Sequence, residues 1–251
     1  MYYGLYLSAA GAAAQGQKVE VLSNNLANVD TVGFKRELAL VAARDSEAIE
    51  RGLVQRGSRT LNDVGGGSEV AETATIFRRG NTRQTGNPTD LAIESENTFF
   101  VVKRGTEELL TRAGNFRLSS EGRLETQDGD SVLATDGSPI DIDPSLPWRF
   151  LPGGYLEQFG EVREVALRQA TNLRQFTKAG SNLFSAPKGA ASQISPEKRQ
   201  VQVETLEMSG VNPMEEMVEL VASQRTYETN VRMIQNHDQM TASLVNRMLK
   251  V

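Results

Sequence analysis

The sequence predicts an α+β protein in which long N- and C-terminal helices pack as a coiled coil, with an antiparallel all-β domain inserted between them in the sequence. Three observations support this fold class. Residues 214–251 contain neither proline nor glycine, residues 5–28 repeat small and apolar side chains with helical spacing, and glycine-containing turns recur at short intervals between the two ends. We expect residues 1–36 and 211–251 to form a helical assembly domain, 37–68 a connector, and 69–210 the β domain.

The overall composition excludes several classes of protein. The chain has 251 residues, 39% of them hydrophobic, and a formal net charge of −5. Its basic residues are scattered, so a nucleic-acid partner is not expected. No apolar run reaches the length of a membrane span, and the first sixteen residues lack the basic start of a signal peptide. The absence of cysteine excludes disulfides and thiolate chemistry.

The N-terminal helix carries a seven-residue repeat of modest side chains. Leu5, Ala12, Val19 and Leu26 recur every seven residues, and Leu22 shares their face. Alanines and glycines surround them, so the helix buries little apolar area on its own. The run from Asn28 to Gly33 favours turn and left-handed conformations and predicts the end of this helix.

The C-terminal helix is predicted to begin at Asn212-Pro213, a good N-cap followed by proline at the first helical position. Its predicted seam consists of two sets of residues with heptad spacing: Leu220, Tyr227, Ile234, Thr241 and Met248, and Met217, Gln224, Val231, Asp238 and Val245. A helix of about 36 residues rises roughly 54 Å, which is longer than most domains can cover. We therefore expect a partner helix. The alternatives are two amphipathic surface helices, or a helical hairpin that closes a globular core.

The middle of the chain changes character twice. Residues 38–53 have an alanine-rich helical pattern, and Gly65-Gly66-Gly67-Ser68 predicts a flexible joint. From Glu69 onward, short apolar runs such as Ile76-Phe77 and residues 99–102 alternate with turns. Asp128-Gly129 and Asp136-Gly137 are typical of hairpin turns, so this part is expected to be an antiparallel meander or barrel.

Candidate catalytic groups are few. His237 is the only histidine and lies within the predicted C-terminal helix, where a structural role is expected. Glu215-Glu216 is the most conspicuous acidic pair, and its position favours compensation of the helix dipole. The triple glycine lacks the lysine that follows in a phosphate-binding loop. We expect no enzymatic activity, metal, cofactor or small-molecule substrate.

Two motifs at opposite ends of the chain resemble those of the bacterial flagellar rod and hook axial proteins. Residues 22–36, LSNNLANVDTVGFKR, resemble the N-terminal signature of that family, and residues 206–218, LEMSGVNPMEEMV, resemble its C-terminal signature, continued by QRTYETN at 224–230. Residues 89–93, 99–102 and 111–116 are similar to the shared core of the family. The sequence departs at Asn97-Thr98, where the family usually has a glycine before the aromatic pair. The length and the two ends of the chain are most similar to the proximal rod subunit.

The resemblance implies a structural subunit of the flagellar basal-body rod that polymerises through its terminal helices into a torque-transmitting shaft. It also implies other copies and other rod or hook subunits as partners, export through the flagellar type III apparatus without a cleaved signal peptide, and assembly in the periplasm. The assembly interface predicted from the two helices consists of Leu5, Ala12, Val19, Leu22, Asn24, Asn25, Leu26, Asn28, Met217, Leu220, Tyr227, Val231, Ile234 and Met248. Two alternatives are open: another self-assembling coiled-coil tube or fibre subunit, and, in a different class, a peptidoglycan-active hydrolase.

Overall fold

The computed structural model describes residues 3–55, 57, 65–180 and 182–248. The chain forms two compact units and passes between them at four points. Unit 1 comprises Met1–Ala27, Glu37–Thr75 and Asn212–Val251, and unit 2 comprises Asn28–Arg36 and Ile76–Val211. The α+β class predicted from the sequence is confirmed.

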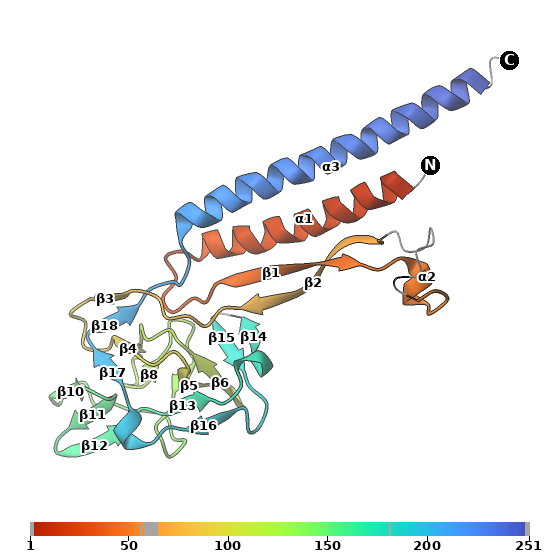
Figure 1. The fold of residues 1–251 in the computed structure, drawn as a ribbon. Helices are drawn as coiled ribbons and strands as arrows, with labels where there is room; N and C mark the ends of the chain where they lie inside the picture. The colour runs from red at the N-terminus through yellow and green to blue at the C-terminus, as the bar shows by residue number, and fades with distance from the viewer. Residues whose placement is uncertain (1–2, 56, 58–64, 181, 249–251) are drawn as a thin grey trace. The chain divides into compact units, whose positions relative to one another are not determined.

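Unit 1 is built from two long helices and a β-hairpin. Its elements are α1 (Tyr3–Ala27), β1 (Glu37–Arg44), α2 (Glu47–Glu50), β2 (Gly67–Thr75) and α3 (Pro213–Met248). Figure 1 shows α1 between α3 and the hairpin, with α1 and α3 running in opposite directions. The terminal helices therefore pair within one chain.

The predicted start of α3 is confirmed. The helix begins at Pro213, and the Asn212 side chain accepts a hydrogen bond from the backbone N–H of Met214 at 3.2 Å. This bond satisfies one of the free donors of the first turn. The predicted stop of the N-terminal helix is also confirmed, because α1 ends at Ala27 and Gly33 adopts a φ of 68°.

The helix predicted over residues 38–53 is wrong for most of its length. Residues 37–44 form strand β1, which pairs antiparallel with β2, and the short helix α2 covers only Glu47–Glu50. Alanine has the highest intrinsic helix propensity, but propensity is a small effect, and the ladder of hydrogen bonds to a strand more than twenty residues away overrides it. Residues 56 and 58–64 of the predicted connector lie outside the described residues.

The glycines predicted to form a flexible joint have defined places at the start of β2. The Gly66 N–H donates to the Arg44 carbonyl at 2.7 Å, and a Cβ on Gly66 would lie 1.9 Å from the Asp45 carbonyl oxygen. A Cβ on Gly67 would lie 2.9 Å from the Ala10 Cβ of α1. Glycine is required here because other chain segments approach closely.

Unit 2 is an antiparallel β structure. A nine-stranded sheet has the order β14-β15-β6-β5-β9-β8-β7, with β13 pairing to β5 and β16; β10-β11-β12 form a second sheet, and β17-β4 and β18-β3 form two pairs. The strands are β3 (Thr82–Gln84), β4 (Leu91–Ile93), β5 (Thr98–Arg104), β6 (Glu107–Thr111), β7 (Arg117–Leu118), β8 (Leu124–Glu125), β9 (Ser131–Val132), β10 (Trp148–Leu151), β11 (Tyr155–Gln158), β12 (Glu161–Glu164), β13 (Leu167–Ala170), β14 (Thr177–Gly180), β15 (Leu183–Ser185), β16 (Ala191–Gln193), β17 (Val201–Val203) and β18 (Thr205–Glu207). Two short 3-10 helices, η2 (Leu173–Gln175) and η3 (Pro196–Lys198), interrupt them.

Two hydrophobic clusters form the core of unit 2. The larger contains Leu91, Phe100 and Phe116 among aliphatic residues of many strands. The smaller contains four aromatic rings, in which Phe77 and Phe99 contact each other and each contacts Phe176 and Phe184. Ile76-Phe77, predicted as strand, lies between β2 and β3 instead, and Phe77 contributes its ring to this cluster.

Candidate assembly surface

The contact between α1 and α3 follows a seven-residue repeat of small and polar residues. A Cβ on Gly4 would lie 3.0 Å from His237 Nε2, and a Cβ on Gly11 would lie 3.1 Å from Asn230 Nδ2. Seven and fourteen residues after Gly11, Lys18 pairs with Glu219 at 3.5 Å and Asn25 donates to Glu216 at 3.1 Å. The absence of side chains at the two glycines lets the helix axes approach closely.

The seam of α3 against α1 differs from the prediction at one of its two heptad positions. Glu216 and Ser223 are buried and Asn230 and His237 are half-buried, whereas Gln224 and Asp238, each one residue further on, are exposed. The predicted seam combined apolar residues with the polar Gln224, Asp238 and Thr241. The narrow space beside the glycines accepts polar residues, so large apolar side chains lie elsewhere on α3.

The predicted interface residues fall into three groups. Those that are buried within the chain are Ala12, Leu22 and Asn25. Those that are half-buried are Leu5, Val19, Leu26, Asn28, Leu220, Val231 and Ile234. Those that are exposed are Asn24, Met217 at 49%, Tyr227 at 42% and Met248 at 74%. Contact of these residues with other copies stays a prediction.

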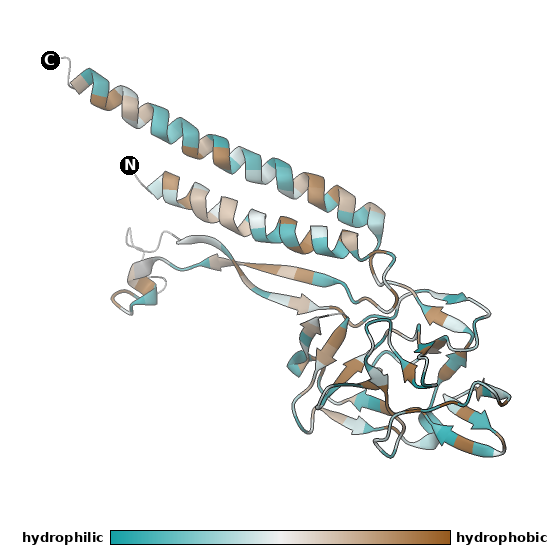
Figure 2. Cartoon of the chain, turned by 180° about the vertical axis from the view of Figure 1, so that it is seen from behind, coloured by the Kyte–Doolittle hydropathy of each residue, from teal (hydrophilic) through white to brown (hydrophobic). Residues whose placement is uncertain are grey.

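Helix α3 exposes large apolar side chains at both of its ends. We name Met214, Met217, Val218 and Val221 the start patch, and Met240, Leu244, Val245 and Met248 the end patch; all eight are exposed. Between them lie exposed polar residues such as Gln224, Arg225 and Gln235. Figure 2 shows hydrophobic turns on α3 separated by hydrophilic ones. Exposed apolar groups of this kind mark interaction sites.

Asn25 is a buried polar link within unit 1. Its side chain donates to the Glu37 carbonyl at 2.8 Å and accepts from the Glu37 N–H at 2.9 Å, in addition to its bond to Glu216. Asn25 and Glu216 are fully buried. The amide therefore fixes the end of α1, the start of β1 and the first turn of α3 together, a structural role that the sequence analysis had assigned to assembly.

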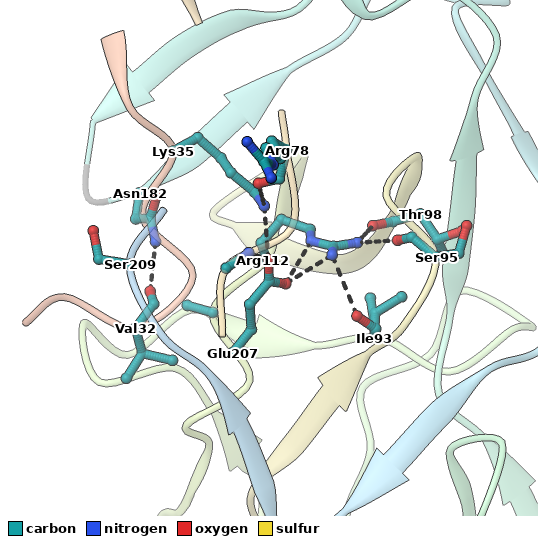
Figure 3. A network of polar contacts seen from close by, with 12 residues as sticks. Val32, Lys35, Arg78, Ile93, Ser95, Thr98, Arg112, Asn182, Glu207 and Ser209 are labelled. Carbon is teal, nitrogen blue, oxygen red and sulfur yellow. Dashed lines mark hydrogen bonds and ion pairs between the residues drawn. The ribbon is translucent and has the colours of Figure 1, made fainter. Parts of the chain in front are cut away.

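Three charged side chains are buried together in unit 2 (Figure 3). Glu207 Oε1 lies 2.7 Å from Lys35 Nζ, and Glu207 Oε2 lies 2.7 Å from Arg112 Nη2. All three side chains are at most 1% exposed. One carboxylate thus serves two cations, and the excess positive charge must be balanced by other acceptors.

Backbone carbonyls provide those acceptors. Lys35 also donates to the Arg78 carbonyl at 2.9 Å, and Arg112 donates to the carbonyls of Ser95, Thr98 and Ile93. Burial lowers the pKa of Lys35 below its ordinary value of 10.5, and the neighbouring Glu207 opposes this shift. Burial likewise lowers the pKa of Arg112, again against the effect of Glu207.

Sequence reasoning missed this network. Lys35 and Glu207 both lie in the quoted motifs, but they are 172 positions apart, and Arg112 is 95 positions from Glu207. A usable signal was the placing of Glu207 between Leu206 and Met208, an apolar setting for a charge.

The described residues contain no group of three or more histidine, cysteine, aspartate or glutamate side chains placed to hold a metal ion. Among the same residues, no helix is long and apolar enough to cross a membrane. His237, the only histidine, faces Gly4 in the helix seam, where a Cβ on Gly4 would lie 3.0 Å from its Nε2 atom.

An antiparallel pair of terminal helices, with a β insertion between them and exposed apolar side chains on the C-terminal helix, is typical of a structural protein. Family models place the chain more narrowly. Residues 5–35 match "Flagella basal body rod protein", residues 92–152 match "Flagellar hook protein FlgE/F/G D1 domain", and residues 202–248 match "Flagellar basal body rod FlgEFG protein C-terminal".

Similarity to known proteins extends over almost the whole chain. It is 33% identical to the flagellar basal-body rod protein FlgG of Caulobacter vibrioides, over 94% of this chain and 95% of the relative. It is 31% identical to the rod protein FlgF of the same organism, over 98% of each chain, and 31% identical to FlgG of Bacillus subtilis, over 98% of this chain and 99% of the relative. The chain belongs to the flagellar basal-body rod protein family, as the two end motifs predict.

Proposed function

We propose that the protein is a structural subunit of the flagellar basal-body rod and that unit 1 is its assembly domain. The observation that carries this proposal is the set of apolar side chains that α3 exposes, in a chain whose relatives are named as rod proteins. Burying these side chains against neighbouring subunits would stabilise the rod by about 25 cal/mol for each Å² of apolar area.

The partners follow from the same proposal. Other copies of this chain and other rod or hook subunits cover the exposed faces of α3, and the flagellar export apparatus delivers the chain to the periplasm without a cleaved signal peptide. A shaft held by many helix contacts in parallel transmits torque because no single contact bears the load. The similarity to both FlgG and FlgF leaves the proximal position a prediction.

The test places a charge on the start patch. Met217→Asp should leave the melting temperature of the purified chain almost unchanged, because Met217 is 49% exposed. A carboxylate buried between subunits costs several kcal/mol, so the variant should disappear from isolated basal bodies and the cells should stop swimming. Both the melting temperature and basal-body incorporation are measured.

Gln224→Asp is the matched control. It lies seven residues further along α3, is exposed, and is already polar. Normal incorporation of Met217→Asp would contradict the role of this patch. Turnover of cell-wall fragments by the purified protein would instead favour the hydrolase alternative.

A further inference from the structure

The end patch lies on the part of α3 that extends beyond the described part of its partner helix α1. The described part of α1 begins at Tyr3, and the last glycine contact on α3 is that of Gly4 with His237. From His237 to Met248 the helix continues for roughly 16 Å at 1.5 Å per residue. Leu244 lies seven residues after His237, and Thr241 and Met248 continue the seven-residue spacing of Leu220, Tyr227 and Ile234. These residues therefore continue the α1-facing side of α3 beyond the described part of α1.

A hollow of about 410 Å³ lies beside this last part of α3. Its lining includes Leu5 of α1 and His237, Met240, Thr241, Leu244 and Val245 of α3. The lining is mainly aliphatic and thioether in character, so it favours aliphatic side chains presented by another helix.

The start patch offers such side chains. Met214, Met217, Val218 and Val221 have the spacing of one helix face, and Met214 and Val218 are 71% and 68% exposed. Leu244, Val245 and Met248 of the end patch lie 27 positions after Met217, Val218 and Val221, which is about 7.5 turns at 3.6 residues per turn. The two patches therefore face opposite sides of the helix, and one copy can use both at once.

The charges near the two patches are complementary. Of the three glutamates in residues 213–221, Glu216 is buried and Glu219 pairs with Lys18, so Glu215 supplies the exposed negative charge. Residues 239–248 include Arg247 and no acidic residue, and Asp238 lies just before them in the lining of the hollow. Glu215 and Arg247 are both exposed. The helix dipoles act in the same direction, because the negative end of one α3 would approach the positive start of the next.

Resting on the proposed rod function, we infer that the end patch of one copy docks on the start patch of the next copy. The next copy's α3 then occupies the place beside Leu244 that the described part of α1 does not reach. The contact joins unlike surfaces, so it repeats without closing and leaves a free patch at each end of the growing assembly.

Cysteine cross-linking tests this contact directly, because the chain has no cysteine of its own. Val218→Cys and Leu244→Cys chains, carrying different tags, are produced in the same cells, and their basal bodies are isolated and oxidised. We expect disulfide-linked pairs that join position 218 of one chain to position 244 of the other, identified by peptide mass. The control combines Gln224→Cys with Gln235→Cys, two exposed polar positions in the middle of α3, and should give no such pair.

The outcomes distinguish the proposed contact between unlike patches from a symmetric contact, and both from a failure of the rod function. Pairs linking 218 to 218 or 244 to 244 would show a symmetric contact and overturn the inference. Incorporation of both chains without a 218–244 pair would overturn it and leave the rod function standing, whereas a wild-type chain absent from basal bodies would overturn the rod function itself.

Charge pairs provide a second measurement that does not depend on cysteine geometry. Val218→Glu alone and Leu244→Lys alone should each lower incorporation at least about tenfold, because each places one charge in an apolar contact. The double variant should recover most of the loss, since every contact then joins opposite charges. A double variant as defective as the two single ones would contradict the inference.

Discussion

A single carboxylate, that of Glu207, pairs with two buried cations in unit 2. Its oxygens lie 2.7 Å from Lys35 and from Arg112, and it also accepts the N–H of Gly80 at 3.0 Å. A buried network of this kind is weak evidence for net stability compared with an apolar core. Removing one partner is a different matter, because the remaining charges stay buried without compensation.

Glu207→Gln should therefore lower the free energy of unfolding of unit 2 by about 3–5 kcal/mol. Trp148, the only tryptophan, lies in β10 of this unit, so its fluorescence during denaturant unfolding reports the change. Glu157→Gln is the control, because Glu157 pairs with Arg149 on the surface, and the loss there should be about 0–1 kcal/mol. Equal losses of unfolding free energy in the two variants would show that removing a charge from the buried network costs no more than removing one from the surface pair.

At the scale of elements, the pairing of α1 with α3 depends on missing side chains more than on large ones. Gly4 and Gly11 lie seven residues apart and face His237 and Asn230. Such a helix pair buries little apolar area, so its stability depends on close approach and on additional contacts with the hairpin and with neighbouring subunits.

Gly11→Leu should separate the two helices and destabilise unit 1 by about 1–3 kcal/mol, since a Cβ alone would lie 3.1 Å from Asn230. Amide hydrogen exchange around Asn230 in the purified chain measures this loss. Ala13→Leu, on the exposed side of the same helix, should leave exchange in α3 unchanged. Unchanged exchange in both variants would contradict the close-packed seam.

At the scale of the whole molecule, neither unit is continuous in sequence. The segment 28–36 belongs to unit 2, although it lies between parts of unit 1. Within unit 2, the Arg36 carbonyl accepts the N–H of Ile76 at 2.9 Å. The residue after which the chain leaves unit 2 and the residue at which it returns therefore lie side by side. Much of the N-terminal motif therefore serves to complete unit 2.

A fragment that joins residues 28–36 to 76–211 through a short glycine-serine linker should unfold cooperatively, because it retains Lys35, Arg112 and Glu207. The fragment 69–210, the β domain expected from the sequence, retains Arg112 and Glu207 but lacks Lys35 and the rest of segment 28–36. We expect its melting temperature to be lower or its amide signals to be poorly dispersed. Equal melting temperatures would show that segment 28–36 is dispensable for folding of unit 2.

The sequence by itself determined the features that depend on neighbouring residues. The α+β class, the start of α3 after Asn212, the turn at Gly33 and strands such as β4 and β5 all follow from caps, turn residues and short apolar runs. The two end motifs were enough for the family. These signals are local, so they can be read without knowing what the segment contacts.

Only the tertiary structure decided the features that depend on distant partners. Residues 37–44 form a strand because β2 supplies its hydrogen bonds, and the α3 seam passes through Ser223 and Asn230 because glycines on α1 leave little room. The network of Lys35, Arg112 and Glu207 joins residues up to 172 positions apart. A charge can remain buried only where the fold brings its partner within hydrogen-bonding distance, and no local pattern contains that distance.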